Sequence, residues 1–396
     1  MWLRILFALG VLVGLHVYLG SRLLQESWLG ESGYWVAWCM LLGSIGLHPL
    51  SFHQRQMGTD RNMQLSGWAS YLTLGGLALL FSLVALRDGL ALLTYASGEM
   101  YCSIVNTPGC QAKWPSWAAY WDQSSVAIVV LSSILAVWGF WEARRIPRIR
   151  HIDIPLPDLP RALWDFRIVQ LTDVHIGPTI RRQFLTRVVD EVNELQADAV
   201  AITGDLVDGS VASLGSQVEA LRELKSRHGT FFVTGNHEYY AGAPAWVEAL
   251  RKWDIDVLEN EHRVLDHDGE SLVVAGVCDF NAGDFVPEHA SDPHKAAAGS
   301  PERAPKILLA HQPRSATKAV EAGFDVQLSG HTHGGQFVPW NLFVPLQQPV
   351  VAGLHRMGSM WLYTSRGTGH WGPPLRLLAP SEITVLRLRG ISAAGT

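Results

Sequence analysis

Aspartate, asparagine and histidine side chains recur in five short clusters in the C-terminal two thirds of the chain, and each cluster directly follows a run of apolar, β-favouring residues. These clusters are Asp173-Val174-His175, Gly204-Asp205-Leu206-Val207-Asp208, Gly235-Asn236-His237-Glu238, His311 and Gly330-His331-Thr332-His333-Gly334-Gly335-Gln336. Carboxylate and amide oxygens with imidazole nitrogens, and no thiolate, suit manganese, iron or zinc. One such cluster alone is usually a turn, but five in this arrangement predict a metal site.

The order of these motifs, DxH, GDxxD, GNHE, a later single His and GHTHGGQ, resembles that of the calcineurin-like metallophosphoesterases. The resemblance extends over residues 147–388. The tail Thr364-Ser365-Arg366-Gly367-Thr368-Gly369, with Pro373-Pro374-Leu375-Arg376, is similar to the membrane-anchored bacterial branch of that superfamily. Some members of that branch act on phosphodiesters or on lipid-linked nucleotide pyrophosphates, so the resemblance implies a metal-dependent phosphoric ester hydrolase.

The resemblance also implies seven ligands for two divalent metal ions, with manganese favoured over iron and zinc. The ligands divide as Asp173, His175 and His333 for one ion, Asn236, His311 and His331 for the other, and Asp205 for both. Two such ions can share a hydroxide that attacks phosphorus in line.

Four further residues have expected roles around these ligands. His237 is the expected catalytic acid beside the phosphate, with a hydrogen-bonding role as the alternative. Asp208 and Glu238 are expected to orient ligands or to cap the following helix. Arg366 is interpreted either as a substrate phosphate ligand or as one half of a surface salt bridge.

The apolar runs that carry the motifs alternate with helical patterns, which is typical of an α/β domain. The expected strands are residues 168–171, 199–203, 231–234, 272–277, 307–310, 326–329, 361–364 and 383–388, with helices at 183–195, 214–227 and 244–253. From the resemblance we expect a two-sheet β-sandwich flanked by helices. The expected domains are a transmembrane helical module at 1–145 and the metallophosphoesterase domain at 146–396.

The first third of the chain is rich in Leu, Val, Ala, Gly and Trp and poor in charge. Four stretches there approach the roughly 17–25 residues that a membrane-spanning helix needs. They are residues 2–24, 34–52, 67–86 and 124–141. We therefore expect a four-helix transmembrane module in a multi-pass protein of the inner membrane.

Basic residues of the connecting segments fall on one side of these four spans. They are Arg4, Arg55, Arg61, Arg144, Arg145, Arg148 and Arg150. The positive-inside rule places that side, with both termini and the catalytic domain, in the cytoplasm. Cys102 and Cys110 share a loop on the opposite side, where a disulfide between them is as plausible as two separate thiols.

The segment 337–346 is apolar, interrupted by Pro and too short to span a bilayer, and it begins just after two expected ligands. This position favours an amphiphilic substrate such as a lipid-linked phosphodiester or pyrophosphate, with packing in the domain core or against a neighbouring subunit as the alternative. A formal net charge of −5 without a basic tract argues against nucleic acid as a partner. His289 and His294 lie in a loop-like segment and are expected to be solvated.

Two other functions remain open at this stage. A general or cyclic-nucleotide phosphodiesterase would use the same metal site, because selectivity lies in the surrounding loops. A membrane sensor or transporter with a regulatory phosphoesterase-like domain belongs to a different class. Against it, the expected spans carry almost no acids or bases besides His16 and His48.

Overall fold

The structure is a computed structural model that describes residues 2–49, 61–105 and 117–391. The chain divides into two compact units, a helical N-terminal unit and a C-terminal unit that contains, of the described residues, 61–64 and 140–391. Each unit is described separately below. Arg55 and Cys110 lie outside the described residues. Cys102 is part of a disulfide. Cys110, its expected partner, lies in the stretch 106–116, which the structure does not describe.

The N-terminal unit consists of long apolar helices. They are α1 (Trp2–Leu23), α2 (Glu26–Gly43), α4 (Arg61–Val105) and α5 (Trp117–Arg144), whose last residues belong to the C-terminal unit. The helices of this unit share a buried apolar cluster that consists of Leu19, Leu23, Leu77, Val84 and Ile128. Helix α2 begins well before the expected span at 34–52, and α4 continues well past residue 86.

Two helical segments within the described residues, Gln64–Ile104 and Trp121–Arg144, are long and apolar enough to cross a membrane. The segment Leu9–Leu23 is also apolar but shorter. By length and composition, the described residues therefore contain two candidate spans and not the four expected from the sequence.

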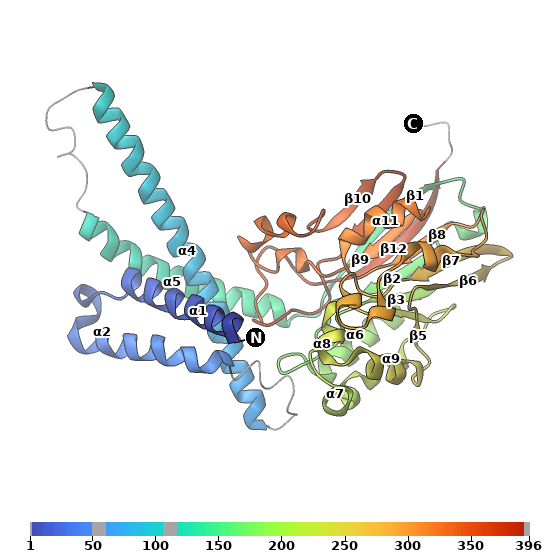
Figure 1. Cartoon of the computed structure of the whole chain (residues 1–396), viewed down its shortest axis with the longest axis horizontal. Coiled ribbons are helices and arrows are strands. Elements are labelled where there is room, and N and C mark those ends of the chain that lie inside the picture. The colour runs from blue at the N-terminus through green and yellow to red at the C-terminus, as the bar shows by residue number, and fades with distance from the viewer. Residues whose placement is uncertain (1, 50–60, 106–116, 392–396) are drawn as a thin grey trace. The chain divides into compact units, whose positions relative to one another are not determined.

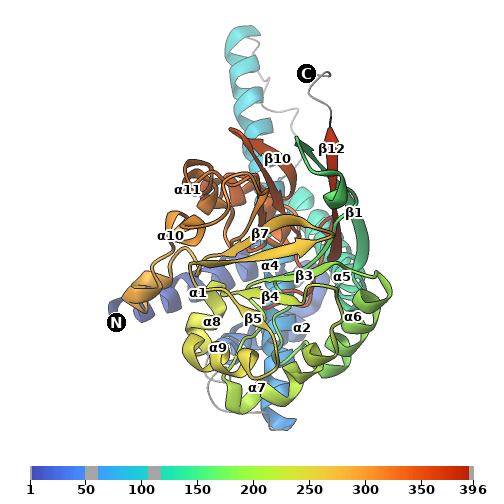
Figure 2. The same cartoon turned by 90° about the vertical axis from the view of Figure 1, so that its right-hand side faces the viewer.

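The C-terminal unit contains two six-stranded mixed sheets (Figure 1, Figure 2). The first has the order β1 (Arg148–Pro157), β12 (Glu382–Ile391), β2 (Arg167–Leu171), β3 (Ala199–Thr203), β4 (Thr230–Val233) and β5 (Asp256–Val257). The second has the order β10 (Gly353–Met357), β11 (Met360–Thr364), β9 (Val326–Ser329), β8 (Lys306–Leu309), β7 (Glu270–Gly276) and β6 (Glu261–His267). The strands β2, β3, β4 and β5 run parallel, as do β7, β8, β9 and β11.

Apolar side chains from both sheets share one buried core, which includes Phe166, Val233, Leu272 and Tyr363. The outer face of the first sheet is covered by α6 (Arg182–Glu194), α7 (Val211–Val218) and α9 (Ala243–Arg251). The outer face of the second is covered by α10 (Pro293–Ala297) and α11 (Ala316–Glu321). The two sheets with flanking helices confirm the expected fold of this domain.

Every strand expected from the sequence is present, and β3 and β9 have the expected bounds. The sequence did not predict β5, β6, β10 or the short helix α8 (Asn236–Ala241). The helix expected at 214–227 is replaced by α7, which ends at Val218, and a 3₁₀ turn at Glu219–Glu223. Residues after Pro147, expected to follow a linker, form the long edge strand β1.

Candidate metal centre

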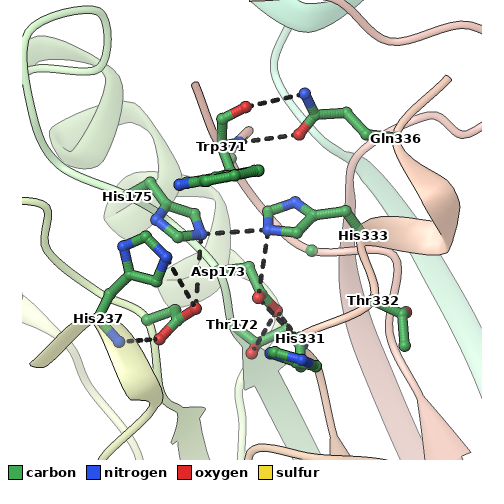
Figure 3. Close-up of polar contacts among 12 residues, drawn as sticks. Thr172, Asp173, His175, His237, His331, Thr332, His333, Gln336 and Trp371 are labelled. Carbon is green, nitrogen blue, oxygen red and sulfur yellow. Dashed lines mark hydrogen bonds and ion pairs between the residues drawn. The ribbon is translucent and has the colours of Figure 1, made fainter. Parts of the chain in front are cut away.

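The five motif clusters lie in loops that follow the carboxyl ends of β2, β3, β4, β8 and β9. Figure 3 shows residues from three of these clusters, namely Asp173, His175, His237, His331 and His333. Asp173, Asp205 and Asn236 follow the adjacent parallel strands β2, β3 and β4. His311 and His331 follow β8 and β9 of the second sheet. Because parallel strands end at a common edge, side chains far apart in sequence share one site.

Asp173, His175 and His333 form the first group, and all three are buried. The His175 Nε2 atom lies 3.1 Å from His333 Nε2, and His333 Nε2 lies 3.4 Å from Asp173 Oδ1. His175 Nδ1 lies 3.1 Å from Asp208 Oδ1. A carboxylate can only accept, so Nδ1 carries the proton and Nε2 keeps its lone pair. Two ring nitrogens and a carboxylate oxygen then point at one place, which suits a cation.

Asp205, His311 and His331 form the second group. His311 Nδ1 lies 2.8 Å from the Thr203 carbonyl oxygen, to which it donates, so its Nε2 lone pair faces the site. That Nε2 atom lies 3.2 Å from Asp205 Oδ2 and 3.3 Å from His331 Nδ1. Asp205 Oδ2 also lies 3.8 Å from His175 Nε2 of the first group. The Asp205 carboxylate therefore lies between the two groups.

Asn236 provides an independent test of whether a cation fits here. Its side-chain oxygen Oδ1 is buried and has no hydrogen-bond partner among the described residues. A buried amide oxygen without a partner costs about 1–3 kcal/mol. The donor set of carboxylates, an amide oxygen and imidazoles is the set that Mn, Fe or Zn accepts. The residues present fit divalent metal ions.

Two glycines make the close approach of these loops possible. A Cβ atom at Gly235 would overlap Asp205 Oδ1, and one at Gly330 would overlap Asp173 Oδ2. Asp173, Asp205 and His331 themselves have positive φ values of 52°, 50° and 70°. Non-glycine residues rarely adopt such angles, and they do so mainly at functional sites where the surroundings enforce them.

His237 lies at the edge of the site, next to both groups. Its Nδ1 atom is 2.6 Å from Asp208 Oδ1, its Nε2 atom is 3.9 Å from Asp205 Oδ2, and its backbone N–H donates to Asp205 Oδ1 at 2.8 Å. The same Asp208 oxygen thus holds His175 and His237. Asp208 contacts imidazoles, in agreement with the expectation that it orients ligands.

Glu238 is the clearest positioning residue of the site. Its carboxylate accepts hydrogen bonds from the backbone N–H groups of Asp205, Leu206 and Gly235 at 3.0, 2.8 and 2.6 Å. It therefore holds the loop after β3 against the start of α8 and caps that helix, as expected from the sequence.

Electrostatics in the site are dominated by burial and by the facing acids and imidazoles. Burial, the largest influence on Asp205, acts to raise its pKa, but the imidazoles of His311 and His237 outweigh it and hold the pKa well below its usual range. Burial raises the pKa of Glu238 to about 7, with Asp205 adding to the effect. Burial, followed by the charge of His311, lowers the pKa of His331 to about 3. A neutral His331 is in the form that binds metals.

Arg366 follows β11 and donates to Glu382 Oε2 at 3.2 Å, so the salt bridge is the contact present in the structure. Its side chain also packs against Gly334, where a Cβ atom would approach the Arg366 Cγ atom to 2.9 Å. Arg366 thus lies beside the loop that carries His333.

Several residues around the site could not be given a role from the sequence, although Gln336 lies in the GHTHGGQ motif. Arg376 is almost fully buried and donates to the backbone oxygens of His333 and Gly369. Gln336 exchanges two hydrogen bonds with the backbone of Trp371, whose ring lies 5.9 Å from that of His237 (Figure 3). Only the Pro-Pro-Leu-Arg tail, noted in the resemblance, pointed toward Arg376.

A family profile and several relatives match this chain. The profile of the calcineurin-like phosphoesterases matches residues 166–335. A bovine (Bos taurus) transmembrane protein with metallophosphoesterase domain is 32% identical over 382 residues, which cover 92% of this chain and 84% of the relative. The chain belongs to the calcineurin-like metallophosphoesterases.

Two further relatives match about two thirds of this chain. A zebrafish (Danio rerio) transmembrane protein with metallophosphoesterase domain is 38% identical over 67% of this chain. An uncharacterized metallophosphoesterase of Helicobacter pylori is 42% identical over 63% of this chain. The match spans 63% of the length of the zebrafish protein and 66% of the length of the Helicobacter protein.

Proposed function

We propose that this metallophosphoesterase uses two divalent metal ions to hydrolyse a phosphoester at a membrane. In this proposal Asp173, His175 and His333 hold one ion, Asn236, His311 and His331 hold the other, and Asp205 holds both. The observation that carries it is the two sets of converging donors. Support comes from the buried Asn236 Oδ1, which has no hydrogen-bond partner among the described residues and whose neighbour His237 donates its backbone N–H to Asp205. We infer manganese as the resident metal because oxygen donors share the site with imidazoles.

When bound, the two ions would lower the pKa of a water molecule and neutralise charge on the phosphoryl oxygens. Residues of the chain orient the imidazoles that would bind these ions. The Asp208 carboxylate keeps the Nδ1 proton on His175, and the Thr203 carbonyl keeps it on His311, so both rings present Nε2 to the site.

His237 is proposed as the group that protonates the leaving oxygen. Its Nδ1 atom is held by Asp208, which stabilises an imidazolium and aims Nε2 into the site. The centroid of its ring lies 5.9 Å from that of Trp371 and 5.2 Å from that of Tyr240. A substrate phosphate that enters past these rings meets His237, and Arg366 is proposed to contact the same phosphate.

The substrate is proposed to be amphiphilic, a lipid-linked phosphodiester or pyrophosphate. The 337–346 segment extends directly from the loop that carries His333. Leu342, Phe343 and Leu346 are 70%, 54% and 80% exposed. Exposed apolar residues clustered in this way are typical of a binding surface. We define the five exposed residues of this segment as the apolar lip, namely Val338, Trp340, Leu342, Phe343 and Leu346.

The N-terminal residues 1–145 are proposed to form the four-helix membrane module, with 146–396 as the catalytic domain on the cytoplasmic side. Support comes from the two candidate spans and from the positions of the flanking arginines. Protease added to intact cells should spare the catalytic domain and should digest it after lysis. Digestion before lysis would place the domain on the opposite side.

The activity itself is tested on the purified full chain in detergent. After metal removal it should not hydrolyse an aryl phosphodiester, and added Mn²⁺ should restore hydrolysis better than Mg²⁺, Zn²⁺ or Fe²⁺. Failure of all four ions to support hydrolysis of aryl phosphodiesters and monoesters would refute the proposal.

A further inference from the structure

A second cluster of potential metal ligands lies one strand farther out in each sheet than the candidate metal centre. Glu259 follows β5, the outer neighbour of β4, and Cys278 follows β7, the outer neighbour of β8. His289 ends a 3₁₀ turn at Pro287–His289. A ligand atom from each of these three side chains lies within 4.8 Å of the others.

Each polar side chain of this cluster is oriented by a partner outside it. His289 Nδ1 lies 2.9 Å from the Tyr239 hydroxyl, and its Nε2 atom lies 3.6 Å from Glu259 Oε1. The tautomer in which Nδ1–H donates to Tyr239 leaves the Nε2 lone pair facing Glu259. Arg251 donates to the other carboxylate oxygen, Glu259 Oε2, at 2.9 Å, so Oε1 faces the cluster. Such outer hydrogen bonds are the usual support of metal-binding histidines and carboxylates.

Asn260, the neighbour of Glu259, ties together the three segments that carry the ligands. Its Oδ1 atom accepts from the backbone N–H groups of Cys278 and Asp292, and its Nδ2 group donates to the carbonyl of Ala290. The asparagine is 4% exposed and has a positive φ of 57°. The three ligands are therefore held in place by one buried side chain before any ion binds.

Access and chemistry suit a metal ion. Cys278 is 1% exposed, whereas Glu259 and His289 line a surface pocket of about 460 Å³. A thiolate, an imidazole and a carboxylate are ligands of zinc, and an open fourth position toward the pocket is available to water. Burial, followed by the charge of Glu259, raises the pKa of the Cys278 thiol to about 12. Without a metal the sulfur thus keeps its proton.

We propose that Glu259, Cys278 and His289 bind one zinc ion at a site separate from the dinuclear centre. Binding releases the Cys278 thiol proton, and the ion takes the thiolate sulfur, the His289 Nε2 atom and the Glu259 carboxylate oxygen. Tyr239, which holds His289, belongs to α8, the helix that begins at Asn236. Through His289 and Tyr239, the zinc ion therefore stabilises the position of the helix that carries Asn236 and His237.

Sulfur makes this site distinguishable from the dinuclear centre, whose proposed ligands are all nitrogen and oxygen. The full chain in detergent, stripped of metal and loaded with Co²⁺ under anaerobic conditions, should show a thiolate-to-cobalt charge-transfer band in the near ultraviolet. Cys278→Ser should abolish the band. Cys39→Ser, which removes the other free thiol among the described residues, should retain it. Asp205→Ala should also retain it, because Asp205 is not one of the three ligands of this site.

Two further measurements keep the test independent of how well one variant folds. His289→Ala removes a partly exposed ligand and should weaken Co²⁺ binding at this site by at least about tenfold. X-ray absorption of the zinc-loaded wild-type protein should show that a fraction of the bound zinc ions have one sulfur ligand. A wild-type protein with only nitrogen and oxygen neighbours, or a charge-transfer band that survives Cys278→Ser, would overturn the proposal.

Discussion

The N-terminal and C-terminal units both bury charged side chains, but they differ in how those charges are satisfied. In the helical unit Arg87 is 5% exposed and donates to Asp88 Oδ1, Ser125 Oγ and the Arg22 carbonyl at 3.0, 3.3 and 3.3 Å. In the C-terminal unit, ring nitrogens of His175 and His333 face each other at 3.1 Å, and Asn236 Oδ1 has no partner among the described residues. In the first cluster the buried arginine is paired within its own unit, whereas the second brings potential metal ligands together and leaves an amide oxygen without a partner among the described residues.

This difference separates a structural polar cluster from a functional one. A buried charge that is paired within its own unit stabilises an arrangement of helices and needs nothing else. Buried ligand atoms that face one another without hydrogen-bond partners are unfavourable on their own. A bound metal ion removes this cost by coordinating them. Substitutions in the second cluster should therefore change metal binding and activity, whereas the first cluster should stay intact.

Asp205→Ala should have the largest effect. Because its carboxylate lies between both ligand groups, the variant should lose Mn²⁺ from both positions and hydrolysis should fall to background. Elemental analysis of Mn-loaded protein, together with phosphodiester hydrolysis, measures both. Asp268→Ala, at a surface aspartate that pairs with Arg227, is the matched control and should behave as wild type. Two Mn²⁺ ions retained in Asp205→Ala would contradict the shared role.

His237→Ala should leave the metal content unchanged and lower kcat by about 10²–10⁴-fold for an alkyl phosphodiester. A nitrophenyl ester has a leaving group that needs no proton, so its kcat should fall much less. His355→Ala, at an exposed position on β10, is the control. Equal losses on both esters would assign His237 to binding and not to proton transfer.

Asp208→Asn should have a smaller effect, because the residue acts through two imidazoles and not on the substrate. An amide holds His175 and His237 less firmly than a carboxylate, so Mn²⁺ affinity and kcat should each fall by about 10–100-fold. Measuring activity as a function of Mn²⁺ concentration separates the loss of Mn²⁺ affinity from the loss of kcat. Unchanged Mn²⁺ affinity would show that the His175 contact does not support metal binding.

The smallest effect is expected at the apolar lip. Trp340→Ser/Phe343→Ser should lower kcat/KM for a diacyl phosphodiester in mixed micelles by about tenfold, equal to ~1.4 kcal/mol, and leave the deacylated head group unaffected. Val264→Ser, an exposed apolar position on β6, is the control. An unchanged preference between the two substrates would exclude a role of the lip in lipid binding and leave the hydrolytic proposal intact.

The sequence predicted the strands that carry the motifs because they are short, apolar and followed by ligand-type residues. It did not predict β6 and β10, in which exposed and half-buried residues dominate, so the apolar signal is weak. The six-residue helix α8 is too short to show a helical period, and its start is set by the Glu238 contact to the β3 loop.

Long-range contacts account for the remaining differences. His289 was expected to be solvated, yet it contacts Tyr239, which is fifty positions earlier in the chain. Arg376 and Trp371 approach the site only because the C-terminal loop folds over the His333 turn. Local sequence patterns contain no information on such pairings. The assignment of ligands to each metal ion, made from the resemblance, stays a prediction.

The central claim is that the unsatisfied donors of the C-terminal unit hold a pair of metal ions that hydrolyse phosphoesters. The most direct test is a Mn²⁺ titration of the metal-free full chain, followed by electron paramagnetic resonance and by phosphodiester hydrolysis in the same samples. The account predicts that activity rises together with the signal of an exchange-coupled Mn²⁺ pair, and that Asp205→Ala shows neither. Full activity with a single uncoupled Mn²⁺, or activity that persists in excess chelator, would contradict it.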